Sequence, residues 1–185
     1  MKKLLILHLL LIAMSLPSLA QHVKFMGIPL TGTIAQFQQK LEAKGVRYNS
    51  YSKYAGPGVR CFKGTFIGQN ANIYVYYDSR TKIVYRAKAC IDYSNEEIAE
   101  RKLEEVKILL KEKYLSFLSE DDTQDGYPSF SIPIQDSESG DIVGVSGLYI
   151  SDGYDEYYNQ IYVLHIDYYD WKNQHAHEGK IMDDL

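Results

Sequence analysis

The residues of this chain best suited to chemistry are three histidines near its C-terminus. His165 precedes Asp167 by two positions in an expected strand, and strand alternation puts both side chains on one face, where a carboxylate could orient an imidazole. His175 and His177 follow in a polar tail. No nucleophile elbow, H-E-x-x-H pair or C-x-x-C motif accompanies them. We therefore assign no catalytic, cofactor-binding or metal-binding residue, and interpret His165 as a hydrogen-bonded strand residue.

The sequence leaves open whether its two cysteines, Cys61 and Cys90, form a disulfide. An oxidising compartment would favour the bond. The strand pattern opposes it, because three hairpin-connected strands at 58–67, 71–78 and 82–92 would put the two residues at opposite ends of a sheet. A disulfide needs Cα atoms within about 7 Å.

Three acidic segments raise the question of calcium. The segment from Asp121 to Gly126 begins like a calcium loop, but Ile132 occupies the position where a bidentate Glu is needed. The segments at 136–141 and 152–156 are also acidic turns. Ordinary hairpin loops account for all three. Carboxylate pairs for glycoside hydrolysis assemble in space, so 24 acidic residues single out no candidate.

Tyrosine is the compositional oddity, with 17 residues, many of them between 149 and 171. Tyrosines there could be rigid amphipathic anchors for a partner, or could fold back and shield a sheet edge. Both alternatives stay open. The partner-binding hypothesis names five residues: Tyr154, Tyr157, Tyr158, Tyr162 and Trp171.

Two capping boxes predict the helices. Thr33 to Gln36 opens a helix with Ile34, Phe37 and Leu41 on one face, and Ser94 to Glu97 opens a longer one that ends near Leu118. The expected core stripe of the longer helix is Ile98, Leu103, Val106, Leu109, Leu110, Tyr114 and Phe117.

Strand patterns predict an antiparallel sheet. Besides the first three strands, segments 129–134, 142–150 and 160–169 alternate, and residues 46–53 form a weaker candidate. In the first three strands, Phe62, Ile73 and Ala87 would share the core face, and the face with Arg86 and Lys88 would be solvated. The fold class is therefore α+β: one or two antiparallel sheets with two helices packed on one face.

The order of elements suggests a duplication. A helix followed by strands occurs twice, which divides a single domain of residues 21–185 into halves at 21–93 and 94–170. Residues 171–185 would be a loosely held polar tail.

The first 20 residues have the pattern of an export signal. Lys2 and Lys3 precede an apolar run from Leu4 to Leu16, and Ser18-Leu19-Ala20 provides a small-x-small cleavage site. Cleavage near Ala20 would make the protein periplasmic or secreted, with no membrane span left in the mature chain. Removing two of 20 basic residues against 24 acidic ones leaves a net charge of −6. That charge disfavours nucleic acid and anionic membranes as partners.

A further set of segments spans most of the mature chain: residues 25–30, 32–34, 63–68, 84–86 and 183–185, together with the Phe37/Leu41 helix. In these segments the chain resembles exported proteins of unknown function from Bacteroidetes-type gut bacteria. The chain departs from the resemblance at Lys113-Tyr114-Leu115, where a Lys-Tyr-Gly stop would be typical. The order of elements is also similar in outline to the β-lactamase-inhibitor-protein fold. The resemblance implies an envelope setting and no known activity, and fold alone does not fix function.

These observations favour a non-enzymatic binding module of the cell envelope that contacts a protein or peptide through a Tyr-rich surface. One alternative is an envelope hydrolase of carbohydrate or peptide, which would need a pocket with two carboxylates, or His165 beside a nucleophile, with shifted pKa values. Another is a small-ligand carrier with an apolar cavity between helix and sheet.

Overall fold

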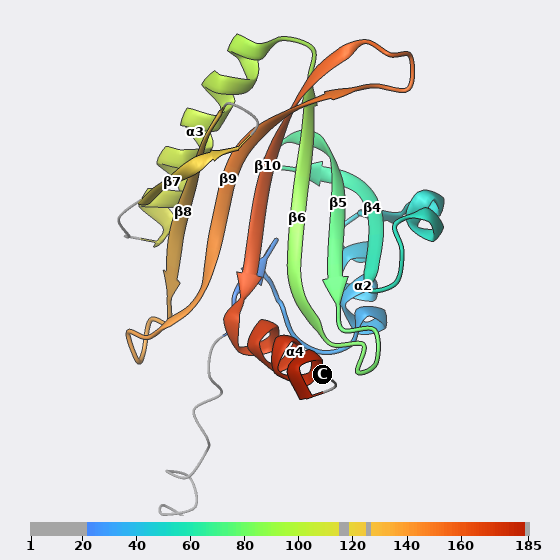
Figure 1. Cartoon of the computed structure of the whole chain (residues 1–185), viewed down its shortest axis with the longest axis vertical. Coiled ribbons are helices and arrows are strands. Elements are labelled where there is room, and N and C mark those ends of the chain that lie inside the picture. Colours follow the sequence, from blue (N-terminus) through green and yellow to red (C-terminus); the bar gives the residue numbers. More distant parts are fainter. Residues whose placement is uncertain (1–21, 115–118, 125–126, 184–185) are drawn as a thin grey trace, which may run out of the picture.

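The computed structural model describes residues 22–114, 119–124 and 127–183 and shows an α+β fold with antiparallel sheets and three α-helices (Figure 1). The helices are α2 (Ile34–Glu42), α3 (Glu96–Tyr114) and α4 (Trp171–Asp183), and η1 (Ser50–Tyr54) is a short 3-10 helix. The strands are β1 (Lys24–Phe25), β2 (Ile28–Pro29), β3 (Arg47–Tyr48), β4 (Val59–Phe66), β5 (Gln69–Tyr77), β6 (Val84–Tyr93), β7 (Ser119–Gln124), β8 (Tyr127–Gln135), β9 (Ile142–Tyr154) and β10 (Gln160–Asp170). No helix in these ranges is long and apolar enough to cross a membrane.

Eight strands form one antiparallel sheet in the order β3-β4-β5-β6-β10-β9-β8-β7. The predicted meander is confirmed as β4, β5 and β6, with Phe62 opposite Ile73 and Ile73 opposite Ala89 on the buried face. The β6–β10 pair joins this meander to the second group of strands. A separate β1–β2 hairpin lies beside the sheet.

One of the two predicted capping boxes is present in the structure, and the other helix is capped by a neighbouring residue. The Thr33 hydroxyl accepts from the Gln36 amide, and the Gln36 side chain accepts from the Thr33 amide, so this capping box is confirmed. At α3 the prediction was one residue off. The Asn95 side chain, not that of Ser94, accepts from the Ile98 amide at 3.0 Å.

One hydrophobic cluster collects buried side chains from the strands, the β1–β2 hairpin, α2 and α3. The α3 helix packs against β6, β8, β9 and β10. It buries Ala99, Leu103, Val106 and Leu110. The predicted stripe was wrong at Ile98 and Leu109, which are exposed, because the buried face of α3 is narrower than expected. Phe117 and the predicted end near Leu118 lie outside the described residues.

Three segments differ from prediction. Residues 119–124, expected as an acidic loop, form β7 and pair with β8. Only Arg47–Tyr48 of the candidate strand at 46–53 is a strand, and η1 follows it. The tail expected to be loose is α4, which packs against the ends of β6, β9 and β10. The predicted export signal lies outside the described residues.

Both cysteines are free and buried. Cys61 lies opposite Tyr74 of β5, and Cys90 lies opposite Asn72 of the same strand. One whole strand therefore separates them, and neighbouring strands lie about 4.8 Å apart. The sheet keeps the two thiols apart laterally, rather than at opposite ends as the sequence suggested.

Candidate functional site

The β9–β10 hairpin extends beyond the strands on either side of it. Its strands pair from Gly144 and Asp170 up to Tyr154 and Gln160. Pairing of β10 with β6 begins only at Tyr162, and pairing of β9 with β8 ends at Leu148. Residues 153–161 thus form a two-stranded projection, visible at the top of Figure 1.

The turn of this hairpin is held by one carboxylate. Asp155 accepts hydrogen bonds from the amides of Tyr157 (2.8 Å) and Asn159 (2.9 Å) and from the Asn159 side chain (2.9 Å). These bonds lower the pKa of Asp155. The turn is ordered by its own hydrogen bonds and needs no partner to set its shape.

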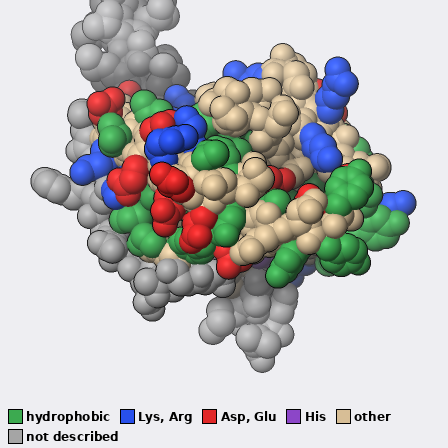
Figure 2. All heavy atoms as spheres, turned by 90° about the horizontal axis from the view of Figure 1, so that it is seen from above, with side chains coloured by type: hydrophobic (Ala, Val, Ile, Leu, Met, Phe, Trp, Pro, Cys, Tyr) green, Lys and Arg blue, Asp and Glu red, His purple; other side chains and the backbone are tan. Residues whose placement is uncertain are grey.

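Three tyrosines are exposed on this projection. The exposed fractions of Tyr154, Tyr157 and Tyr158 are 72%, 75% and 88%. Tyr158 also has a φ of 64°, a left-handed conformation that is uncommon in a non-glycine residue. We call these three residues the hairpin tip. Figure 2 shows this end of the molecule, with acidic side chains gathered on one side and hydrophobic ones spread over both.

The other two residues of the hypothesis lie elsewhere. Tyr162 is partly buried and packs against the core. Trp171 begins α4, beyond the far end of β10. Trp171 is nine positions beyond Tyr162 along the extended chain, roughly 30 Å at 3.3 Å per residue. The structure therefore does not bring Trp171 to the hairpin tip.

The sheet face opposite the core carries a polar network centred on an ion pair. The guanidinium of Arg86 donates to both oxygens of Asp167, at 2.9 and 2.6 Å. The rings of Tyr76 and Tyr169 flank the guanidinium carbon, with centroids at 4.4 and 4.5 Å. Asp167 is 1% exposed and Arg86 22%. This face was expected to be solvated. Lys63 is exposed as expected, but Arg86 is paired with Asp167 and largely buried.

His165 lies on the same sheet face, and in the described residues no hydrogen bond joins it to Asp167. Its Nδ1 is 3.3 Å from Cys90 Sγ, its Nε2 is 2.8 Å from Ser151 Oγ, and its ring stacks on Tyr149 at 4.4 Å. Sequence reasoning missed this pair, because Cys90 and His165 become direct neighbours only through the β6–β10 register.

A histidine beside a cysteine raises the question of thiol catalysis. Burial raises the pKa of Cys90 to about 12, and burial together with Lys88 and Arg86 lowers the pKa of His165 to about 4. A thiol nucleophile needs the opposite shifts, toward thiolate and imidazolium. At neutral pH both groups are uncharged. The imidazole hydrogen-bonds with the Cys90 thiol on one side and the Ser151 hydroxyl on the other, so the group acts as a structural hydrogen-bond chain.

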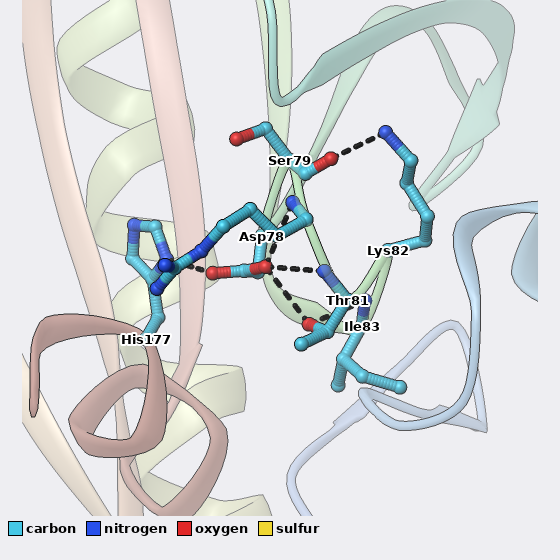
Figure 3. Close-up of polar contacts among 7 residues, drawn as sticks. Asp78, Ser79, Thr81, Lys82, Ile83 and His177 are labelled. Carbon is cyan, nitrogen blue, oxygen red and sulfur yellow. Dashed lines mark hydrogen bonds and ion pairs between the residues drawn. The ribbon is translucent and has the colours of Figure 1, made fainter. Parts of the chain in front are cut away.

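One of the two tail histidines, His177, anchors α4. His177 Nδ1 lies 2.8 Å from Asp78 Oδ2, and its ring stacks on Tyr85 at 4.8 Å. Figure 3 shows Asp78 holding the β5–β6 turn as well, through the Thr81 amide and hydroxyl. Asn173 adds bonds to the carbonyl oxygens of Leu30 and Val84. His175 is exposed.

In the acidic turn at 136–141, an aspartate carboxylate accepts hydrogen bonds from backbone amides of the same turn. Asp136 accepts from the amides of Glu138 and Ser139 at 2.9 and 2.8 Å, as Asp155 does in the next turn. Residues 125 and 126 of the first acidic segment lie outside the description. Within the part of the chain that the structure describes, no three His, Cys, Asp or Glu residues are grouped so that they could hold a metal ion.

Comparison of the chain with protein-family models, curated proteins and solved structures finds no match. The resemblance to exported proteins of Bacteroidetes-type bacteria therefore stays a prediction. The site must be interpreted from its own geometry.

Proposed function

We propose that this protein is an exported, non-enzymatic binding module that contacts a protein or peptide through its hairpin tip. The observation that supports this most directly is the ordered projection of Tyr154, Tyr157 and Tyr158 into solvent. Tyrosines with few rotatable bonds in a preformed turn lose little entropy on binding. Aromatic residues of this kind supply much of the binding energy at protein interfaces.

The charge of the hairpin indicates the character of the partner. Residues 152–160 contain Asp152, Asp155 and Glu156 and no Lys, Arg or His. A complementary surface would be basic, and its association would weaken as salt screens the charges. The acidic cluster seen in Figure 2 lies at the same end of the molecule.

The proposed setting is the periplasm or the extracellular space. It rests on the charged start, apolar run and small-x-small site of residues 1–20. A partner would then be an envelope or secreted protein.

We also infer that the domain is a duplicated helix-plus-strands unit with α2 and α3 on one face of the sheet. Each helix precedes four strands, and the sheet order runs β3 to β6 and then β10 back to β7, so the two sets of strands have mirrored orders. Buried residues of α2 and α3 belong to the same hydrophobic cluster. The hairpin tip would occupy the second unit only.

Chemical crosslinking of the protein to the envelope fraction of its native host, read by mass spectrometry, tests the hairpin tip. We compare the triple variant Tyr154→Ala/Tyr157→Ala/Tyr158→Ala with a matched control, Tyr51→Ala/Tyr54→Ala. The control removes tyrosines that are 66% and 73% exposed on η1. We expect crosslinks at residues 153–161, and a yield that falls at least tenfold in the tip variant alone. Equal yields from the tip variant and the unmodified protein would refute the proposal.

A further inference from the structure

A second candidate site lies on the core face of the sheet, between α3 and the two hairpin turns β1–β2 and β4–β5. It is a groove of about 550 Å³, within the range of small-molecule sites. Its buried wall is apolar and consists of Phe66, Val106, Leu110, Ile166 and Tyr168. The exposed side chains of Ile67 and Leu109 and the partly exposed Met26 extend this apolar surface toward solvent.

Two strained turns place Met26 and Ile67 at this groove. Met26-Gly27 joins β1 to β2, and Ile67-Gly68 joins β4 to β5. All four residues have positive φ, at 52°, 75°, 45° and 76° in that order. Two-residue turns of this type favour Asn or Gly at the first position, and a β-branched residue there is an outlier. The apolar side chains at these positions are explained by the groove rather than by the turns.

The charged residues of the groove are both basic. Lys44 and Lys113 are exposed, and no acidic side chain lines the groove with them. Lys113 Nζ lies 4.8 Å from the centroid of the Tyr114 ring and 5.9 Å from that of Tyr168. The structure gives neither lysine an ion pair with a carboxylate in the described residues. In a chain of net charge −4, this combination suits an anionic headgroup next to an apolar chain.

We propose that this groove binds an anionic amphiphile with a single alkyl chain. The chain would lie against Phe66, Leu109 and Leu110, and the headgroup would lie between Lys44 and Lys113. This site is independent of the hairpin tip, since no residue is shared. A free fatty acid and a lysophospholipid present the same chemistry, and the ligands tested distinguish them.

Isothermal titration calorimetry of the full chain with dodecanoate, well below its micelle concentration, tests the proposal. We expect saturable binding that weakens about tenfold for decanoate, since each buried methylene contributes to transfer from water. Dodecyltrimethylammonium, with the same chain and a cationic headgroup, should bind at least tenfold more weakly. Lyso-phosphatidylglycerol is titrated as well, to represent an anionic lysophospholipid. Tighter binding of it than of dodecanoate assigns the ligand to lipids, and the reverse assigns it to free fatty acids.

Adjacent residues of α3 supply the matched control. Leu109 and Ile108 are 55% and 56% exposed, but only Leu109 lines the groove. We expect Leu109→Ser to weaken dodecanoate binding about fivefold and Ile108→Ser to leave it unchanged. Ile67→Asn should weaken binding while keeping the melting temperature, because Asn suits the positive φ. Lys44→Glu/Lys113→Glu should weaken dodecanoate and strengthen the cationic amphiphile, whereas Lys111→Glu should change neither.

Three results would overturn the proposal: absence of saturable dodecanoate binding, equal binding of the cationic amphiphile, or equal losses in Leu109→Ser and Ile108→Ser. Either of the last two would show that association does not use this groove. None of these outcomes bears on the hairpin tip, whose crosslinks are measured separately.

Discussion

Replacing His165 by Gln should make the protein more resistant to acid. Burial and the charges of Lys88 and Arg86 lower the pKa of His165 to about 4, against 6.5 for an unperturbed imidazole. As pH falls, the unfolded chain takes up this proton first, so the free energy of unfolding falls between pH 6.5 and pH 4. The stabilisation is complete above pH 6.5. The displacement corresponds to at most about 3 kcal/mol at pH 4.

Urea denaturation followed by circular dichroism at pH 7.5, 5.5 and 4.0 measures this difference. The His165→Gln variant should lose up to about 3 kcal/mol less than the unmodified protein over this range. His175→Gln, at an exposed position of α4, is the control and should keep the full acid loss. The contacts of His177 with Asp78 and of His22 with Asp170 involve neither substituted residue. If His165→Gln lost as much stability on acidification as the control, the assignment of a buried, neutral imidazole would be wrong.

Two further predictions concern the sheet face opposite the core. Arg86→Met should lower the free energy of unfolding by about 3–5 kcal/mol, because it leaves a carboxylate that is 1% exposed without its partner. Adding Asp167→Asn should restore part of this loss in urea denaturation, and strictly additive losses would contradict the ion-pair interpretation. Ellman's reagent at pH 8 should label neither cysteine in the folded protein and both in denaturant, since both thiols are buried and burial raises the pKa of Cys90 to about 12. Rapid labelling of the folded protein would contradict this assignment.

The meander could be predicted because its information is local. Alternation in β4, β5 and β6 and the turn residues between them define the strands without knowledge of the rest of the chain. The β7 strand, with the sequence SEDDTQ, has no alternation and owes its conformation to pairing with β8. The α4 helix lacks a clear apolar stripe and is anchored by polar contacts of Asn173 and His177. Tertiary partners decide such segments, so local patterns miss them.

The polar contacts on the sheet face opposite the core could not be predicted from the sequence, for a related reason. Alternation correctly placed His165 and Asp167 on one face of β10. Their partners come from β6, and the two strands are separated by more than 60 residues of chain. Nothing in the sequence states that β6 and β10 are neighbours. Only the sheet order shows that Asp167 pairs with Arg86 and that His165 pairs with Cys90.

Backbone strain helps to decide which surfaces are functional. In the described ranges, four non-glycine residues have positive φ: Met26, Ile67, Lys82 and Tyr158. Lys82 has a structural explanation, since its backbone bonds to Asp78 and to the first residue of α2, and its side chain bonds to the Ser79 carbonyl (Figure 3).

At Tyr158 the amide donates to the Asp155 carbonyl, but this bond leaves the choice of a tyrosine side chain unexplained, and the described residues show no side-chain hydrogen bond for Met26 or Ile67. Asn or Gly would relieve a cost of about 1 kcal/mol at each of them. Tyr158 is directed into solvent at the hairpin tip, whereas Met26 and Ile67 line the groove beside α3. A residue that strains its backbone and leaves apolar surface exposed contributes little to folding, so its side chain is best explained by binding. Arg86, Asp167, Cys90 and His165 on the opposite sheet face have no comparable strain, and their contacts are accounted for by stability alone.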